Sequence, residues 1–151
     1  MKTKKHLLLA FAALGLIVGT TSCKKYDNGG NKKKAEKNIT NSWKIDQYLM
    51  DGVDQTSALL ISNYVETFVS GGEYTRSYTD DSGDAQSETG TWSLVDDKDR
   101  INVTGTGSYE LTAETSTVST SDYDIIKLTA DELWYSFENG GNAHEFHMVP
   151  Q

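Results

Sequence analysis

The sequence predicts an all-β domain, an antiparallel up-and-down barrel or flattened barrel of about eight strands. Short runs in which apolar and polar residues alternate follow one another from about residue 43. Turn residues, mainly Gly, Asp and Asn, separate most of these runs. Thr, Ser, Tyr and Val are abundant and the single proline is Pro150, which also favours strands. A barrel or a sandwich would fit, and closure into a barrel would remove exposed sheet edges.

The first expected strand covers residues 43–50, where Trp43, Ile45, Gln47 and Leu49 share one face. Asp51-Gly52 follows as a turn signal. Residues 56–62 contain four consecutive apolar residues and are expected to form a short helix or a lid. The next strand is expected over residues 64–69.

Two hairpins are expected in the middle of the chain. Gly71-Gly72 turns the chain into a strand over residues 73–78, with Tyr74, Arg76 and Tyr78 on one face. A polar loop then leads to residues 89–95, which place Gly90, Trp92 and Leu94 on one face. The acidic residues 96–99 turn the chain into a strand over residues 100–104.

The last third of the chain completes a count of eight or nine strands. Residues 109–113 alternate with period two and are expected to form a strand, whereas residues 116–121 read as a loop or edge. Residues 123–128 and 133–137 follow as strands around a short turn. Asn139-Gly140-Gly141-Asn142 is the strongest hairpin signal in the chain. It leads to a closing strand over residues 143–149.

Residues 1–22 have the three parts of a secretory signal. Three lysines begin the segment, an unbroken apolar run covers residues 7–19, and the small residues 20–22 precede Cys23. The apolar run has 13 residues, whereas a helix that spans a membrane needs about 20. The segment is therefore interpreted as a removable signal rather than a permanent span.

Cys23 is the only cysteine of the chain, so it cannot form an internal disulfide. Thr21-Ser22-Cys23 resembles the lipobox of bacterial lipoproteins of the Bacteroidota type, in which the cysteine becomes the acylated N-terminus. The resemblance implies attachment of lipid at Cys23 and a place in the cell envelope, with the outer membrane expected and its face left open. The alternative is an ordinary secretory signal followed by a free thiol.

The charge is divided unevenly between the parts of the chain. Residues 23–37 carry six lysines against two acidic residues and almost nothing apolar, so they are expected to form a flexible basic tether. The domain, residues 38–151, holds 20 acidic and five basic residues. The tether lysines could bind anionic lipid head groups, or they could serve only as a solvated spacer, which is the favoured interpretation. An acidic domain repels a phosphate backbone, which argues against nucleic-acid binding.

The order of short motifs from about residue 40 to 150 resembles the lipocalin-like domains of Bacteroidota lipoproteins. This resemblance implies an eight-stranded barrel whose mouth can hold a small apolar ligand. The matching pieces are Trp43-Lys44-Ile45, Asp51-Gly52, Phe68 with Tyr74, Gly90-Thr91-Trp92-Ser93-Leu94, Ile101-Asn102-Val103, the segment 123–129, Leu133 and Phe137.

Five aromatic residues are the candidates for lining such a ligand site, because they fall in the inward phase of their strands. The alternative is that they form the core, which is favoured because a domain of this size needs its large aromatic residues for burial. The candidates are Trp43, Tyr64, Phe68, Tyr74 and Trp92.

The sequence offers little for catalysis or metal binding. His144 and His147 lie three residues apart, and on a strand they would point to opposite faces, so no metal site is expected there. The acidic turns at residues 80–84 and 96–99 lack the ligand spacing of a calcium-binding loop and are ordinary turns in composition. No Gly-x-Ser-x-Gly motif occurs. We therefore expect no catalytic residues, no metal and no cofactor.

These observations predict a non-enzymatic lipoprotein of the envelope. Its expected work is binding a small hydrophobic ligand. The alternative is a structural or accessory protein with a filled core that binds other envelope proteins and no ligand. The expected partners are the membrane, through the N-terminal lipid, and either a small hydrophobic molecule or an envelope protein.

Overall fold

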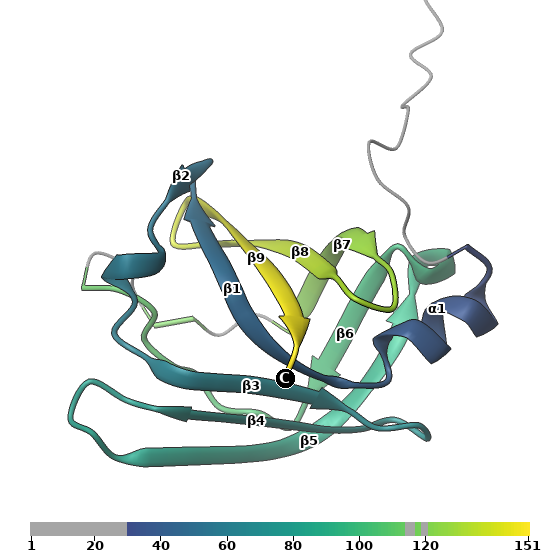
Figure 1. Cartoon of the computed structure of the whole chain (residues 1–151), viewed down its shortest axis with the longest axis horizontal. Coiled ribbons are helices and arrows are strands. Elements are labelled where there is room, and N and C mark those ends of the chain that lie inside the picture. Colours follow the sequence, from purple (N-terminus) through teal and green to yellow (C-terminus); the bar gives the residue numbers. More distant parts are fainter. Residues whose placement is uncertain (1–29, 114–116, 119–120) are drawn as a thin grey trace, which may run out of the picture.

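The computed structural model describes residues 30–113, 117–118 and 121–151, and these residues form a β-barrel with one helix beside it (Figure 1). Residues 1–29, which include the expected signal and Cys23, lie outside the described part. The elements are α1 (Lys32–Ile39), β1 (Ser42–Met50), β2 (Val53–Asp54), the 3₁₀ helix η1 (Thr56–Ala58), β3 (Ser62–Phe68), β4 (Glu73–Thr79), β5 (Ala85–Val95), the 3₁₀ helix η2 (Asp96–Lys98), β6 (Arg100–Thr104), β7 (Asp122–Leu128), β8 (Leu133–Asn139) and β9 (Asn142–Pro150).

The strands pair in sequence order as an antiparallel meander, and the last strand returns to the first. β1 pairs with β9 from Trp43 opposite Pro150 to Met50 opposite His144, with one irregularity in register between Ile45 and Gln47. β2 extends only the far end of β1, so eight strands make up the closed wall. This confirms the predicted antiparallel up-and-down barrel, which is also the architecture of lipocalins.

Alternation along the strands decides what the barrel contains, because successive side chains point to opposite faces of a sheet. In β3 the buried residues are Tyr64, Glu66 and Phe68, and in β4 they are Tyr74, Arg76 and Tyr78. The predicted face of β4 is therefore confirmed as the inward one. The hairpin between these strands uses Gly71 and Gly72, both with positive φ (102° and 94°), a conformation that favours glycine.

One predicted strand is absent. Residues 109–113 make only a single bridge, Tyr109 opposite Val118, and otherwise form a loop. Tyr109 and Leu111 are nevertheless buried, and the backbone N–H of Leu60 donates to the carbonyl of Leu111 at 2.7 Å. The apolar residues Tyr109 and Leu111 are therefore buried by a loop, whereas Ala113 is exposed, and the strand prediction was wrong.

The helix α1 lies in a segment that the sequence analysis assigned to the flexible tether. The Asn31 side chain caps the helix by accepting a hydrogen bond from the backbone N–H of Lys34 at 3.0 Å. Ala35 and Ile39, one turn apart, are fully buried, and the indole N–H of Trp43 donates to the Ile39 carbonyl at 2.8 Å. Residues 32–37 therefore belong to the folded domain, because two apolar residues at helical spacing anchor a segment that is otherwise polar.

The expected short helix or lid at residues 56–62 is realised as η1 and the start of β3. Within the described ranges, no helix has the length and apolar character needed to cross a membrane.

Candidate functional site

The barrel interior is filled by side chains rather than open. All five candidate ligand-lining aromatic residues are buried in it, with Trp43 fully covered and Trp92, the most accessible, 8% exposed. Phe68 packs edge-on against both Tyr74 and Trp92, with ring centroids 5.2 and 5.6 Å apart. Tyr64 lies in a different group, against Tyr78, Tyr109 and Phe146. These residues occupy the core, and Trp92 also lines the cavity described below.

A buried carboxyl group joins the tyrosines of the interior. Glu66 is 1% exposed, and its Oε1 accepts hydrogen bonds from the hydroxyls of Tyr64 at 2.9 Å and Tyr74 at 2.6 Å. Its Oε2 accepts a third from Tyr135 at 2.9 Å. A buried carboxyl group without partners would be costly, and these three hydroxyls satisfy it.

Arg76 places a positive charge in the same interior. Its Nη2 donates to Glu88 Oε2 at 2.5 Å and to the carbonyl of Gly107 at 2.8 Å. The guanidinium carbon lies 4.0 Å from the ring centroid of Tyr109. Arg76 thereby fastens the 105–112 loop to the wall of the barrel through a cation–π contact and a charge-assisted hydrogen bond.

Burial raises the pKa of the interior tyrosines. For Tyr64, Tyr74 and Tyr135 the pKa lies well above its ordinary value, first because of desolvation and second because of the nearby Glu66. Desolvation, with a smaller effect of Asp51, raises the pKa of Tyr48 to about 12. The interior therefore favours neutral tyrosine hydroxyls that donate hydrogen bonds, and this is a structural role.

A cavity lies outside the packed interior, between α1 and one end of the barrel. It has a volume of about 880 Å³. We call it the helix groove; it is lined by Lys32, Lys33, Glu36, Lys37, Thr40, Ser70, Gly71, Gly72, Trp92, Ser93 and Leu94.

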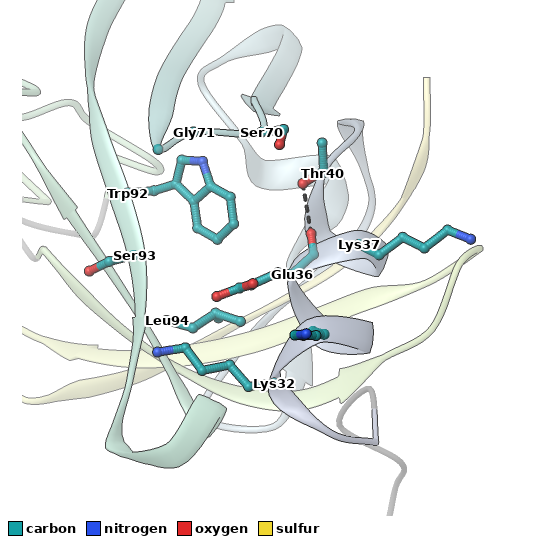
Figure 2. A pocket seen from close by; sticks show the side chains of 11 residues that line it. Lys32, Glu36, Lys37, Thr40, Ser70, Gly71, Trp92, Ser93 and Leu94 are labelled. Atoms are coloured by element: carbon teal, nitrogen blue, oxygen red, sulfur yellow. Dashed lines mark hydrogen bonds between the residues drawn. The ribbon is translucent and has the colours of Figure 1, made fainter.

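The helix groove has one apolar wall and one charged wall. Figure 2 shows the Trp92 ring and the Leu94 side chain facing α1 from β5. On α1, Glu36 and Lys32 reach toward this apolar wall, whereas Lys37 points away from it (Figure 2). The Thr40 hydroxyl donates to the backbone carbonyl of Glu36 at 2.7 Å, closing the last turn of the helix. The groove can therefore accommodate a molecule with an apolar part and a polar part.

A smaller cavity of about 290 Å³ lies near the turn at residues 80–84, at the other end of β4. Its acidic lining residues are Asp80, Asp81 and Glu110. Asp80 already accepts hydrogen bonds from the backbone N–H groups of Ser82 and Asp84, at 3.1 and 2.9 Å. The hydrogen bond with the side chain of Gln86 lowers the pKa of Asp80 most, and these backbone hydrogen bonds lower it further. The carboxyl group thus serves the turn itself.

His144 and His147 point to opposite faces of β9, as predicted. His144 is buried and its Nδ1 lies 2.8 Å from the hydroxyl of Tyr48. His147 lies on the outer face, where it stacks on Trp134 at 3.8 Å and its Nε2 is 2.6 Å from Glu145 Oε1. In the described part of the chain, no three His, Cys, Asp or Glu side chains come together in a way that could hold a metal ion.

Sequence reasoning missed Glu66 and the helix groove. Glu66 falls in the same strand phase as Tyr64 and Phe68, so its alternation contained a signal for an inward carboxyl group. The groove had no such signal, because one of its walls is the helix that the sequence analysis did not predict.

The sequence matches no protein-family model, and no curated protein is significantly similar to it. Among solved structures, a lipocalin-like protein from Bacteroides uniformis is similar, with a TM-score of 0.47 and 13% identity, covering 76% of this chain and 99% of the other. An uncharacterized protein from Bacteroides eggerthii has a TM-score of 0.46 and 14% identity, covering 75% of this chain and 99% of the other. Japanin from Rhipicephalus appendiculatus, solved bound to cholesterol, has a TM-score of 0.46 and 12% identity, covering 74% of each chain.

Proposed function

We propose that this protein is a non-catalytic lipoprotein of the cell envelope that binds a small hydrophobic molecule in the helix groove. The observation that carries the proposal is the apolar wall of Trp92 and Leu94 facing a cavity of about 880 Å³. Binding sites for small molecules are typically cavities of about this size that combine apolar walls with a few polar groups.

The groove is a better site than the barrel interior. Inside the barrel, Glu66 and Arg76 are each 1% exposed and surrounded by tyrosines. A ligand there would have to displace side chains that satisfy one another's hydrogen bonds, which is unfavourable. In the groove, a ligand would contact the edges of Trp92 and Leu94 that remain exposed, 8% and 6% of these residues, without breaking any of these contacts.

Ligand binding is tested with a neutral fluorescent hydrophobic probe and two serine-to-phenylalanine variants. Ser70 is exposed and lines the groove, whereas Ser87 is exposed on β5 away from it. We expect Ser70→Phe to fill part of the groove and weaken probe binding, and Ser87→Phe to leave it unchanged. Equal binding of the probe to both variants, or no binding to the parent protein, would count against the groove as a ligand site.

The anchoring part of the proposal rests on the signal-like residues 1–22 and on Cys23. Two or more acyl chains would hold the protein firmly, since each buried methylene contributes about 0.8 kcal/mol and one chain alone is marginal. We expect Cys23→Ala to abolish incorporation of labelled palmitate and to release the protein from the outer-membrane fraction. Recovery of the parent protein in the medium with a free thiol would refute the proposal.

The filled interior is also what a structural or accessory envelope protein would have. In that second candidate function, the protein binds other envelope proteins and no small ligand. Cross-linking in intact envelopes, followed by identification of the partners, tests it. A defined partner captured equally by the parent protein and by Ser70→Phe, together with no probe binding, would favour this second function.

A further inference from the structure

Two opposite charges on α1 face the apolar wall of the helix groove. Lys32 and Glu36 lie one helical turn apart on α1 and both reach toward the wall formed by Trp92 and Leu94 (Figure 2). No ion pair joins them to each other or to other side chains within the described ranges. Both charges are thus available to a ligand.

The groove is also locally basic on a strongly acidic domain. Three lysines and one glutamate line it, whereas residues 38–151 hold 20 acidic and five basic residues. A phosphate group would meet repulsion over most of the surface and attraction at Lys32 and Lys33. The adjoining Glu36 would in turn attract a positive group.

The position of α1 brings the groove close to the membrane if Cys23 is lipidated. Eight residues lie between Cys23 and Lys32. Even fully extended, that segment spans roughly 30 Å, so the groove would lie within about one bilayer thickness of the head groups. A lipid of the same membrane is therefore the molecule that the groove would meet at the highest local concentration.

We propose that the helix groove binds phosphatidylethanolamine, a phospholipid whose head group carries a phosphate and a primary ammonium. Lys32 and Lys33 hold the phosphate, Glu36 holds the ammonium, and Trp92 and Leu94 cover the first part of an acyl chain. This proposal rests on the function proposed above, and it adds the identity of the ligand. It uses the two opposite charges of α1 that reach toward the groove, together with the apolar wall opposite them.

The full-length protein, reconstituted in phosphatidylcholine nanodiscs, is titrated with dihexanoyl phosphatidylethanolamine, dihexanoyl phosphatidylglycerol and dihexanoyl phosphatidylcholine. The readout is the tryptophan emission, to which Trp92 contributes from the groove wall. We expect the ethanolamine lipid to bind most tightly, because only its head group combines a phosphate with a compact N–H donor for Glu36. Equal affinities for the three lipids would overturn the proposal.

Variants of α1 test the contact with the phosphate and the contact with the ammonium separately. Glu36→Gln is expected to weaken phosphatidylethanolamine binding roughly threefold to fivefold, because it removes the attraction between the carboxylate and the ammonium. The same variant is expected to strengthen phosphatidylglycerol binding, because it removes the repulsion between the carboxylate and the anionic lipid. Lys32→Gln is expected to weaken both by about fivefold. The matched control is Lys34→Gln, since Lys34 lies on the same helix but does not line the groove.

The outcomes distinguish this proposal from the function on which it rests. If Ser70→Phe weakens binding of the neutral probe but Glu36→Gln changes the affinity for both phospholipids in the same direction, the head-group assignment is overturned and ligand binding in the groove stands. If neither the probe nor any phospholipid binds to the parent protein, both proposals are overturned. Opposite shifts for the two phospholipids in Glu36→Gln would support the assignment.

Discussion

At the scale of single residues, the carboxyl group of Glu66 connects three strands of the barrel. It accepts hydrogen bonds from Tyr64 of its own strand, from Tyr74 of β4 and from Tyr135 of β8, which lies across the interior. Each bond satisfies a hydroxyl that has no water available, and Tyr135 is only 1% exposed. The buried carboxyl group therefore links β8 to β3 and β4, with which β8 does not pair in the sheet.

We expect Glu66→Ala to lower the free energy of unfolding by about 3 kcal/mol, because it leaves three buried hydroxyls without their acceptor and creates a cavity. Glu66→Gln should cost less, since the amide oxygen retains part of the acceptor capacity. Denaturant unfolding measures both. The control is Glu73→Ala on the exposed face of β4, which should change stability by less than about 0.5 kcal/mol. Equal losses of unfolding free energy in Glu66→Ala and Glu73→Ala would contradict this role of Glu66.

Gly90 is required by a close approach between backbones. A Cβ atom at this position would lie 2.1 Å from the carbonyl oxygen of Thr104, which is backbone and cannot rotate away. We expect Gly90→Ala to destabilise the protein by about 2 kcal/mol, because β5 and β6 must move apart to accept the methyl group. Thermal unfolding measures the loss. Thr89→Ala, an exposed neighbour, serves as the control, and a Gly90→Ala variant as stable as this control would refute the argument.

At the scale of elements, strand positions could be predicted because each has one face in the core. The aromatic residues of β3 and β4 repeat every second position, and that period specifies both the strand and its inward side. The same rule failed at residues 109–113, where Tyr109 and Leu111 are buried by a loop. An alternating apolar pattern indicates only that some side chains are buried. Burial also occurs in the 105–112 loop, which Arg76 binds from the interior through the Gly107 carbonyl.

The helix α1 was missed for the opposite reason. Its sequence is mostly lysine, and it reaches the core only through Ala35 and Ile39. Composition therefore indicated a solvated segment, whereas tertiary packing decided the structure. Because α1 forms one wall of the helix groove, the groove could not be predicted either, and among the five candidate residues only Trp92 lies on it.

The stability of α1 depends on its cap as well as on this packing. We expect Asn31→Ala to destabilise the helix by about 1 kcal/mol, since the backbone N–H of Lys34 loses its acceptor. Hydrogen–deuterium exchange should accelerate in residues 32–39, while amides of β8 and β9 exchange as in the parent protein. Unchanged exchange in 32–39 would show that packing of Ile39 alone holds the helix.

At the scale of the whole molecule, closure and filling of the barrel belong together. The sheet closes through the long pairing of β1 with β9, and the space enclosed by eight strands is small enough for side chains to fill. Here the filling consists largely of tyrosines whose hydroxyls point at Glu66 and toward one another. A polar but water-poor interior results, and the fold can hold it only while these hydroxyls remain neutral.

Alkaline pH should therefore unfold the protein as a unit. Tyr64, Tyr74 and Tyr135 have pKa values raised well above the ordinary 10.0, chiefly by desolvation. A group whose pKa is raised on folding stabilises the fold fully below its unfolded pKa, and this contribution is lost as the pH rises through the folded value. We expect the free energy of unfolding to decrease steadily above about pH 10.

Tyrosinate absorbance, followed alongside circular dichroism, should rise for the interior tyrosines only as the barrel unfolds. Ionisation of these tyrosines near pH 10 with the circular dichroism intact would show that water reaches the interior, and would contradict the filled barrel on which the assignment of the ligand to the helix groove depends.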